Sequence, residues 1–354
     1  MSNGKDDDEI PTPQRPPSPP LHTTFTVRGI HAPTFSAFRP RDIKISSPHS
    51  MTHVAWSCDG KRLGATGIDK SIRVWQPEHS LELRSATSYN THTDDLDYFA
   101  WNPTHADLFC SSSQRDRRIV FWDARQSKPT HTINLKYTPV QLVYSPDAST
   151  ILSVSSLYKL FILTYGKDGE DSPEQWRVRP SPEPLVSLPI TTVLFNHTGD
   201  AFITAHTADA NLRAIRYPSI TSATSFAAHV GGCIATAFDP RGQYLASGGH
   251  DSIVNLFDTS DWICTRTITA CDNSIHALSF SHDGEFIAIA NSGAYIDICA
   301  TETGMPMHRI PAPGPAQAVS WHPSQPLVAY CGQTKSKEGG PAPLAYVSVF
   351  GPGI

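Results

Sequence analysis

The sequence predicts an all-β fold: a single seven-bladed β-propeller that is closed by an N-terminal strand and preceded by a disordered, Pro-rich tail. From position 56 onward, an aromatic residue that ends an alternating apolar strand recurs every 41 to 51 residues, a period typical of four-stranded propeller blades. A polar turn with Pro, Asp or Gly follows each aromatic residue, as a tight hairpin requires. A further apolar residue closes a later strand of each repeat. Three features that recur seven times in phase predict seven blades.

These repeated residues also set the expected bounds of the blades. The strand-ending aromatic residues are Trp56, Trp101, Tyr144, Phe195, Phe238, Phe280 and Trp321. The residues that close a later strand are Trp75, Trp122, Leu163, Ile215, Phe257, Cys299 and Phe350. The expected blades cover residues 50–84, 92–128, 136–180, 186–222, 229–268, 274–310 and 315–351.

Two blades depart from the regular repeat. Blade three carries an insertion, residues 166–173, before its expected outer strand at 175–178. Blade seven contains a polar, Gly- and Pro-rich loop, residues 333–343, and ends at its third strand. We expect residues 40–46 to supply the missing outer strand, because this pairing removes an exposed sheet edge and joins the two ends of the chain.

The first 24 residues differ from the rest in composition. An acidic run, residues 6–9, precedes six prolines between positions 11 and 20. Such a segment lacks the apolar residues of a core, so we expect a disordered tail with polyproline II character over 1–24 and a propeller over 25–351. A solvating tail is the simpler interpretation, and a docking peptide with Ser18 as a phosphorylation site is the alternative.

Composition and charge narrow the classes of function. The chain has 28 Lys and Arg, 33 Asp and Glu, and a net charge of −5, which argues against a face that grips nucleic-acid phosphates. Its seven cysteines are scattered without CxxC spacing, as in a protein of a reducing compartment. No apolar stretch is long enough to predict a membrane span.

The sequence contains no recognisable catalytic motif. A phosphate-cradling Gly-rich loop, a zinc-binding HExxH motif and a GxSxG elbow are all missing. The 16 histidines show no metal-ligand spacing, although His229, His250 and His276 could meet on one face as a zinc site. We therefore predict no catalytic residue, cofactor, metal or small-molecule substrate, and an enzyme is the least favoured alternative.

Two blades carry residues that resemble the WD40-repeat family. Blade two has His92, Ser112, Asp116 and Trp122, and blade five has His229, Ser247, Asp251 and Phe257. The resemblance implies that the turn Asp accepts a hydrogen bond from the His, which bonds onward to the Ser and the Trp, so that the buried carboxylate is paired. The residues to which it assigns structural roles are Trp56, Asp69, Trp75, His92, Asp116, Trp122, His229, Asp251 and Phe257.

Three blades lack part of this pattern. Blade one keeps Asp69 and Trp75 but has no matching His, while Leu157 and Gly293 stand where the turn Asp belongs in blades three and six. We expect these blades to depend more on packing.

The same resemblance implies a partner-binding face, formed by the turns between second and third strands and by the start of each innermost strand. The candidates are Asp95, Asp97, Arg115, Arg117, Arg118, Thr191, Ile234, His250, Ser274, His276 and Gln317. The basic run 115–118 is either a contact for an acidic helix or RNA phosphates, or an ordinary solvated turn. Asp95 and Asp97 lie close enough in sequence to offset its charge, so any RNA contact is expected to be weak.

Within the WD40 proteins, the chain resembles the family formed by the third subunits of the THO complex. The stretches that carry this resemblance are residues 54–60, 238–244, 279–284, 295–304 and 319–323. It implies a non-catalytic, nuclear subunit of the THO (TREX) complex that supports messenger ribonucleoprotein assembly and mRNA export. The implied partners are other THO subunits, chiefly the large helical scaffold subunit, with a DEAD-box RNA helicase and an export adaptor as indirect associates.

Other interpretations remain open. The chain could be another nuclear or cytosolic WD40 scaffold, such as a subunit of a chromatin complex. Residues 122–125 match the WDxR signature of propellers that act as substrate receptors of cullin-4 ubiquitin ligases. The Pro-rich N-terminus and the insertion in blade three depart from the animal THO subunits and point to a fungal member. No basic localisation cluster is evident, so we expect nuclear import or retention through partners.

Overall fold

The computed structural model describes residues 25, 29–167, 174–180, 189–206, 210–220, 223–335 and 342–353. The chain divides into two units, Met1–Ala32 and Pro33–Ile354. The predicted tail, residues 1–24, lies outside the described residues. In the first unit, the N–H of Ile30 donates to the carbonyl of Phe25 across 2.9 Å. Every described strand belongs to the second unit.

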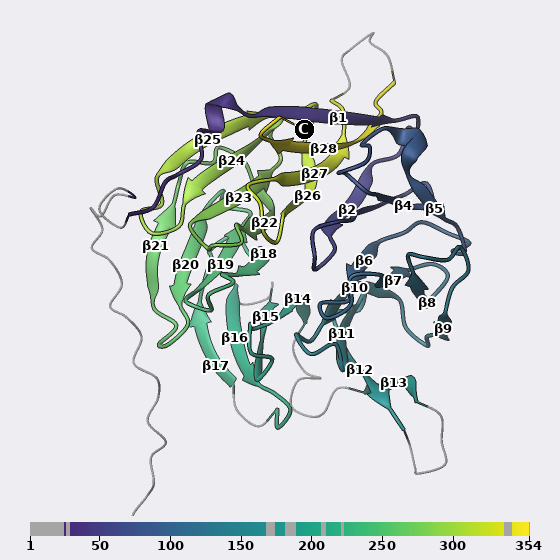
Figure 1. Cartoon of the computed structure of the whole chain (residues 1–354). Helices are drawn as coiled ribbons and strands as arrows, with labels where there is room; N and C mark the ends of the chain where they lie inside the picture. The colour runs from purple at the N-terminus through teal and green to yellow at the C-terminus, as the bar shows by residue number, and fades with distance from the viewer. Residues whose placement is uncertain are drawn as a thin grey trace, which may run out of the picture. The chain divides into compact units, whose positions relative to one another are not determined.

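The second unit is a seven-bladed β-propeller, as the sequence predicts. Its described residues form seven antiparallel sheets of four strands each, which Figure 1 shows arranged around a common centre. The innermost strands, β2, β6, β10, β14, β18, β22 and β26, contact one another in this order, and β26 contacts β2. The ring of innermost strands is therefore closed.

The strands of the first three blades run from the innermost to the outermost in chain order. Blade one has β2 (Met51–Trp56), β3 (Leu63–Gly67), β4 (Ile72–Trp75) and β5 (Thr87–Tyr89). Blade two has β6 (Tyr98–Trp101), β7 (Leu108–Ser113), β8 (Arg118–Asp123) and β9 (His131–Asn134). Blade three has β10 (Pro139–Tyr144), β11 (Thr150–Ser155), β12 (Leu160–Gly166) and β13 (Gln175–Pro180).

Blades four to six follow the same order, and blade seven joins both ends of the chain. Blade four has β14 (Ile190–Phe195), β15 (Ala201–His206), β16 (Asn211–Arg216) and β17 (Ala223–Ala227). Blade five has β18 (Cys233–Phe238), β19 (Tyr244–Gly249), β20 (Val254–Asp258) and β21 (Cys264–Ile268). Blade six has β22 (Ile275–Phe280), β23 (Phe286–Asn291), β24 (Tyr295–Ala300) and β25 (Pro306–Pro311). Blade seven has β26 (Ala316–Trp321), β27 (Val328–Gln333), β28 (Ala345–Gly351) and β1 (Arg39–Ile45). Two 3₁₀ helices, η1 (Phe35–Ala37) and η2 (Leu83–Ser85), complete the described elements.

Three predicted blade ends are wrong, all at outermost strands. The outer strands of blades one, two and four run to Tyr89, Asn134 and Ala227, whereas the sequence placed the ends at 84, 128 and 222. Outermost strands such as β5 and β9 carry fewer buried residues than the inner strands, so their apolar pattern is weak. In β9, for example, three of four residues are exposed. The outer strand of blade three is confirmed and extends from Gln175 to Pro180.

The predicted closing strand is confirmed. β1 pairs antiparallel with β28, from Arg39 opposite Gly351 to Ile45 opposite Ala345. Ile43 and Ile45 expose 4% and 2% of their surface and pack with apolar residues of blades one and seven. Burial of these side chains and seven paired residues hold the N-terminal strand on the last blade.

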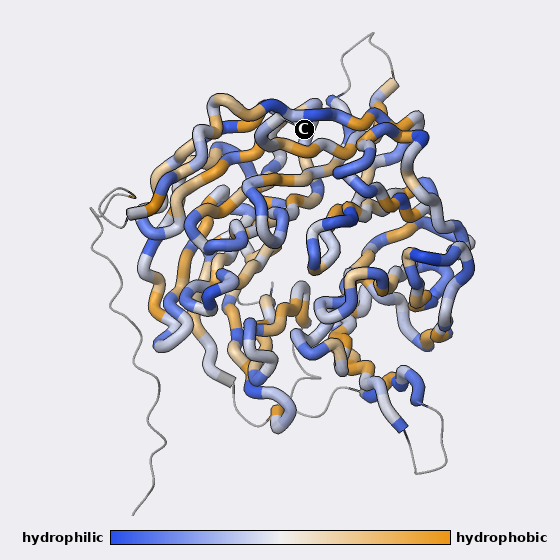
Figure 2. Tube along the Cα trace, in the orientation of Figure 1, coloured by the Kyte–Doolittle hydropathy of each residue, from blue (hydrophilic) through white to orange (hydrophobic). Residues whose placement is uncertain are grey.

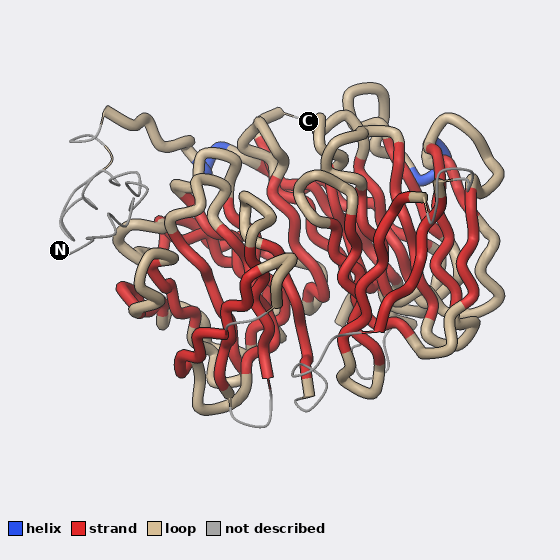
Figure 3. The backbone as a smooth tube through the Cα atoms, turned by 90° about the horizontal axis from the view of Figure 1, so that it is seen from below, coloured by secondary structure: helices blue, strands red, loops and turns tan. Residues whose placement is uncertain are grey.

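Apolar side chains fill the spaces between blades. Figure 2 shows apolar segments along the strands, and Figure 3 shows the turns gathered at the two ends of the strands. Two of the repeated aromatic residues also donate hydrogen bonds between blades. Trp56 Nε1 donates to Ser320 O at 3.2 Å, and Trp101 Nε1 donates to Ala55 O at 3.0 Å. The repeated aromatic residue therefore links neighbouring innermost strands as well as filling the core.

Candidate partner-binding face

Most innermost strands begin with a β-bulge. Between six of these strands and their second strands, the register shifts by one residue near the start. A bulge re-aims the side chain of the extra residue. The extra residues are Thr52, Val140, Thr191, Ile234, His276 and Gln317. Asp97 holds the equivalent position just before β6, where its N–H donates to Ser112 O at 3.1 Å. We call the surface formed by these seven residues the bulge face.

The sequence identified five of these seven residues. Asp97, Thr191, Ile234, His276 and Gln317 were predicted, whereas Thr52 and Val140 were missed. Each bulge-face residue lies four positions before the repeated aromatic residue of its blade. This fixed offset is the signal that identifies all seven.

Several bulge-face side chains are engaged in bonds to the backbone. Thr52 Oγ1 donates to Leu96 O at 3.1 Å, which joins blade one to the start of blade two. His276 Nδ1 lies 3.0 Å from Ala316 O at the start of blade seven, and its Nε2 lies 2.9 Å from Ser292 Oγ. These contacts hold the starts of neighbouring innermost strands together.

Four further predicted candidates, on blades four to seven, differ in how accessible their side chains are. Thr191 Oγ1 donates to Ala205 O at 3.1 Å, and Ile234 is half-buried. His250 is exposed, with Nδ1 3.1 Å from Ser274 Oγ. Gln317 is exposed. Exposed Gln317 and His250 are therefore the more accessible of these groups.

In blade two, acidic and basic candidates lie side by side. Asp97 accepts hydrogen bonds from the backbone N and the Nε2 of Gln114, at 2.7 and 2.9 Å. Burial raises the pKa of Asp97, while Gln114 opposes the shift. The Arg115 side chain is 71% exposed, with Nη1 3.4 Å from Asp94 and 3.8 Å from Asp95. Two carboxylates therefore offset the charge of Arg115.

The two remaining arginines of the basic run differ in exposure. Arg117 is exposed and adopts a left-handed backbone conformation, with φ 54°. Arg118 is half-buried at the start of β8. The basic run thus presents Arg115 and Arg117 to solvent.

A hydrogen-bonded network holds the turn of blade two. His92 Nδ1 lies 2.8 Å from Asp116 Oδ2, and its Nε2 lies 2.8 Å from Ser111 Oγ. Trp122 Nε1 donates to the same Ser111 oxygen at 2.9 Å. The sequence assigned this role to Ser112, which is wrong. Successive residues of a strand face opposite sides, so Ser112 lies on the other face of β7, where its buried hydroxyl has no partner among the described residues.

Blade five contains a shorter version of this network. His229 Nδ1 lies 3.1 Å from Asp251 Oδ1, and its Nε2 lies 2.9 Å from Ser247 Oγ. Phe257 occupies the position of the Trp and offers no hydrogen-bond donor. The network therefore ends at Ser247.

Blade one replaces the missing His with an arginine. Arg73 Nη2 lies 2.5 Å from Asp69 Oδ2, and Ser71 Oγ donates to Asp69 at 2.9 Å. Burial opposes ionisation of Asp69, but the hydrogen bond and charge of Arg73 outweigh it and lower its pKa. Blade six likewise pairs buried Asp297 with Arg309 at 2.7 Å. In blades one and six an Asp–Arg ion pair therefore accompanies packing, and the expected greater dependence of blades one, three and six on packing stays a prediction.

Leu157, at the turn-Asp position of blade three, is 75% exposed. Among the three blades that lack part of the WD40 pattern (one, three and six), blade three thus carries an exposed apolar side chain at the turn position.

A cavity of about 420 Å³ opens on the bulge face between blades seven and one. Its lining residues are Ser50, Thr52, Ile68, Pro315, Gln317, Gln333, Thr334 and Lys335. Hydroxyl and amide groups and one ammonium group suit a polar peptide backbone or a carboxylate. The sequence predicted Gln317 alone of this set, because the other residues come from four separate segments of the chain.

Close backbone approach shapes this cavity. A Cβ atom on Gly314 would lie 2.1 Å from Gln333 O, and one on Gly332 would lie 2.2 Å from Pro315 O. Glycine at both positions lets the two backbone segments pass each other.

Arg125 of the WDxR signature lies beyond the end of β8. Its Nη2 lies 2.7 Å from Asp123, and its Nε lies 3.6 Å from Asp107. The hydrogen bond from Arg125 lowers the pKa of Asp123. The Arg125 side chain is 61% exposed, and its role in a ubiquitin ligase stays a prediction.

No group of three or more His, Cys, Asp or Glu among the described residues is arranged to hold a metal ion. His229, His250 and His276 each have separate partners, as described above. All seven cysteines are free thiols. Within the described parts of the chain, no helix is long and apolar enough to cross a membrane.

Comparison with known proteins agrees with the repeats. Residues 42–76 and 220–258 match the family described as WD domain, G-beta repeat. The β-propeller domain of Cps50 (Swd1) from Myceliophteria thermophila, a crystal structure, is similar with a TM-score of 0.70 and 16% identity, over 87% of this chain and 99% of that one. The fold and these matches define the class: the chain is a WD-repeat β-propeller.

Two similarities cover most of this chain. The chain is 30% identical to THO complex subunit 3 of Arabidopsis thaliana over 315 residues, 89% of this chain and 93% of that protein. It is also 25% identical to the WD repeat-containing protein AAC3 of Dictyostelium discoideum, over an alignment of 384 positions that covers 99% of this chain and 74% of that protein. The chain belongs to the family of THO complex subunit 3. These relatives lend no support to the expected fungal source.

Proposed function

We propose that the chain is a non-catalytic scaffold subunit of the THO (TREX) complex that supports messenger ribonucleoprotein assembly and mRNA export in the nucleus. The observation that carries this proposal is the 30% identity to THO complex subunit 3 of Arabidopsis thaliana, over 93% of that protein. Coverage of nearly the whole relative means that the complete propeller, rather than a few shared repeats, is alike.

The chemistry of the described residues supports a binding role. The buried histidines that resemble catalytic groups, His92 and His229, are held in hydrogen-bonded networks with their own blades. The bulge face instead combines hydroxyl, amide, imidazole and carboxylate groups with two aliphatic side chains, Val140 and Ile234. Such a surface suits contacts with a protein partner, which on this proposal is chiefly the large helical scaffold subunit.

Charge argues for protein rather than RNA as the direct partner. The net charge of −5 and the two carboxylates beside Arg115 weaken attraction to phosphates. We therefore place the DEAD-box RNA helicase and the export adaptor as indirect associates, and we expect any RNA contact to be weak.

The proposal is tested by purifying the tagged chain at native expression level from nuclease-treated extract and identifying the bound proteins by mass spectrometry. THO subunits in stoichiometric amounts after nuclease treatment would support a protein-held scaffold role. A cullin-4 adaptor, or chromatin modifiers without THO subunits, would contradict it.

Nuclear import through partners is tested separately. A fluorescently tagged chain is followed in cells in which the other THO subunits are depleted. We expect the tagged chain to leave the nucleus. Nuclear accumulation without these partners would contradict the proposed route of import.

A further inference from the structure

A second cavity, of about 550 Å³, lies between blades two and three. Asn102 and Ala148 line it, and both follow the ends of innermost strands, so the cavity opens at the end of the strands opposite the bulge face. The other lining residues are Leu108, Phe109, Phe121, Trp122, Thr130, His131, Tyr144, Tyr165, Glu174, Gln175 and Trp176. Its volume and aromatic lining are typical of ligand sites.

The residues on either side of the insertion in blade three, Tyr165 on β12 and Glu174, Gln175 and Trp176 at the start of β13, form one wall of this cavity. β12 and β13 remain paired as far as Gly166 and Gln175, and Tyr165 lies opposite Trp176 in this pairing. Register partners place their side chains on the same face of a sheet. The two rings therefore lie on one face of the β12–β13 pair.

The aromatic rings meet across the two blades. Trp176 stacks on Phe121 of blade two, with ring centroids 5.3 Å apart and planes at 13°. Tyr165 and Tyr144 lie 5.4 and 6.0 Å from the Trp176 ring. Tyr165 is 49% exposed, so part of this cluster is open to a ligand. Aromatic faces carry partial negative charge and attract cations.

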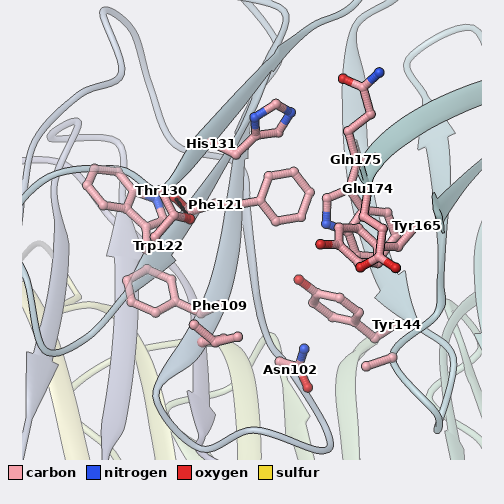
Figure 4. A pocket seen from close by; sticks show the side chains of 13 residues that line it. Asn102, Phe109, Phe121, Trp122, Thr130, His131, Tyr144, Tyr165, Glu174 and Gln175 are labelled. Carbon is pink, nitrogen blue, oxygen red and sulfur yellow. Dashed lines mark hydrogen bonds between the residues drawn. The ribbon is translucent and has the colours of Figure 1, made fainter. Parts of the chain in front are cut away.

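One carboxylate lies in this aromatic setting. Figure 4 shows Glu174, Tyr165 and Tyr144 on one side of the cavity, across from Phe121 and His131. Glu174 is exposed and makes no ion pair or side-chain hydrogen bond with the described residues. No Lys or Arg is found among the described residues that line the cavity. The described lining of the cavity thus contains a carboxylate, Glu174, but no basic side chain to pair with it.

We propose that this cavity binds an arginine side chain of a partner polypeptide. A guanidinium group is planar, so it can lie flat on an aromatic ring while its N–H groups donate to a carboxylate in a bidentate pair. Tyr165 and Trp176 supply the rings, and Glu174 supplies the carboxylate. The cavity, of about 550 Å³, also has room for residues that flank the arginine in a peptide segment.

Two other ligands fit this chemistry less well. A lysine ammonium is compact and strongly hydrated, so it gains less from flat aromatic surfaces. A nucleic-acid base can stack on the same rings, but its phosphates would be repelled by Glu174. The inference concerns a surface outside the bulge face and does not rest on the proposed function.

The test uses the full chain labelled with fluorotryptophan and observed by NMR, with the Trp176 signal assigned from the Trp176→Phe variant. The probe is the peptide acetyl-Gly-Arg-Gly-amide. Its control is the same peptide with citrulline, which keeps the shape of arginine but lacks its charge. We expect the arginine peptide to shift the Trp176 signal to saturation and the citrulline peptide to leave it unchanged.

Variants locate the binding group. Glu174→Gln should weaken binding of the arginine peptide about tenfold, because it removes a charge-assisted hydrogen bond. The matched control is Glu78→Gln, which changes an exposed glutamate of blade one and should leave binding unchanged. Both positions are exposed, so neither variant is expected to impair folding.

Four results would overturn the proposal. These are an unmoved Trp176 signal, equal binding of the citrulline peptide, equal binding of a lysine peptide, and unchanged affinity of Glu174→Gln. A short oligouridine that shifts the Trp176 signal when the arginine peptide does not would assign the cavity to nucleic acid instead.

Discussion

Nδ1 of His92 lies 2.8 Å from Oδ2 of Asp116, and the two side chains expose 1% and 2% of their surface. Burial lowers the pKa of His92, although Asp116 opposes this shift. The imidazole is therefore neutral at physiological pH. In that state Trp122 donates to Ser111, Ser111 to His92, and His92 to Asp116, so every member of the network is paired.

Replacing His92 with alanine should destabilise the propeller strongly. The variant leaves the carboxylate of Asp116 buried without its main partner, and the expected loss is about 3 kcal/mol of the free energy of unfolding. Arg115→Ala is the control, because this exposed side chain should contribute less than about 1 kcal/mol. Urea unfolding followed by circular dichroism measures both. A loss for His92→Ala no larger than that for Arg115→Ala would contradict the structural role of the network.

His53 should make stability depend on pH. Its ring lies 4.3 Å from Tyr98, its Nδ1 has no partner among the described residues, and burial lowers its pKa from 6.5 to about 4. As the pH falls, His53 therefore binds a proton at a higher pH in the unfolded chain than in the folded chain. The contribution of His53 to the free energy of unfolding is complete above pH 6.5 and is lost as the pH falls toward about 4. The loss is at most about 3 kcal/mol.

His53→Phe isolates this contribution from those of the carboxylates that titrate in the same range. Phenylalanine cannot take up a proton, so the stability of the variant relative to the original chain should rise steadily as the pH falls from 6.5 to 4. Urea unfolding at several pH values measures the difference. A difference that stays constant with pH would mean that His53 is not the titrating group.

Gly314→Ala should distort the cavity of the bulge face. The new Cβ would lie 2.1 Å from Gln333 O and 2.8 Å from the Lys335 N, so the backbone must shift, at a cost of about 1–3 kcal/mol. Gly166→Ala is the matched control, because a Cβ there meets nothing within 4 Å. Thermal unfolding compares the two. Equal unfolding temperatures would show that the two backbone segments can separate without penalty.

Changes on the bulge face at Gln317, or beside it at Arg115, should release partners, whereas a change at the WDxR signature should not. Gln317→Arg places a charge in the cavity between blades seven and one, and Arg115→Glu adds a third negative charge beside Asp94 and Asp95. Both variants should lower recovery of THO subunits in the purification described above. Arg125→Ala should leave recovery unchanged. The reverse result would favour a ubiquitin-ligase receptor.

The blades could be predicted because their signals are local. A strand with an alternating apolar pattern, an aromatic end and a Pro, Asp or Gly turn is specified by neighbouring residues, and it recurs in β2, β18 and β26 alike. The closing strand β1 was predicted for a related reason: blade seven lacks a fourth strand, and an open sheet edge needs a partner. Outermost strands such as β5 and β9 were placed less well, since exposed strands carry little apolar pattern.

The residues themselves thus specify the number of blades, their order and five of the seven bulge-face positions. The hydrogen-bond partners and the cavities are decided by tertiary structure, because they depend on contacts between residues that are distant in the chain. Whether Ser111 or Ser112 meets His92 depends on which face of β7 turns toward the network. The stack of Trp176 on Phe121 exists because Trp176, on the outermost strand of blade three, lies beside Phe121 on β8 of neighbouring blade two. Local sequence patterns do not show which residues of different strands and blades come into contact. Those contacts are fixed only when the strands pair and the blades pack into a closed ring.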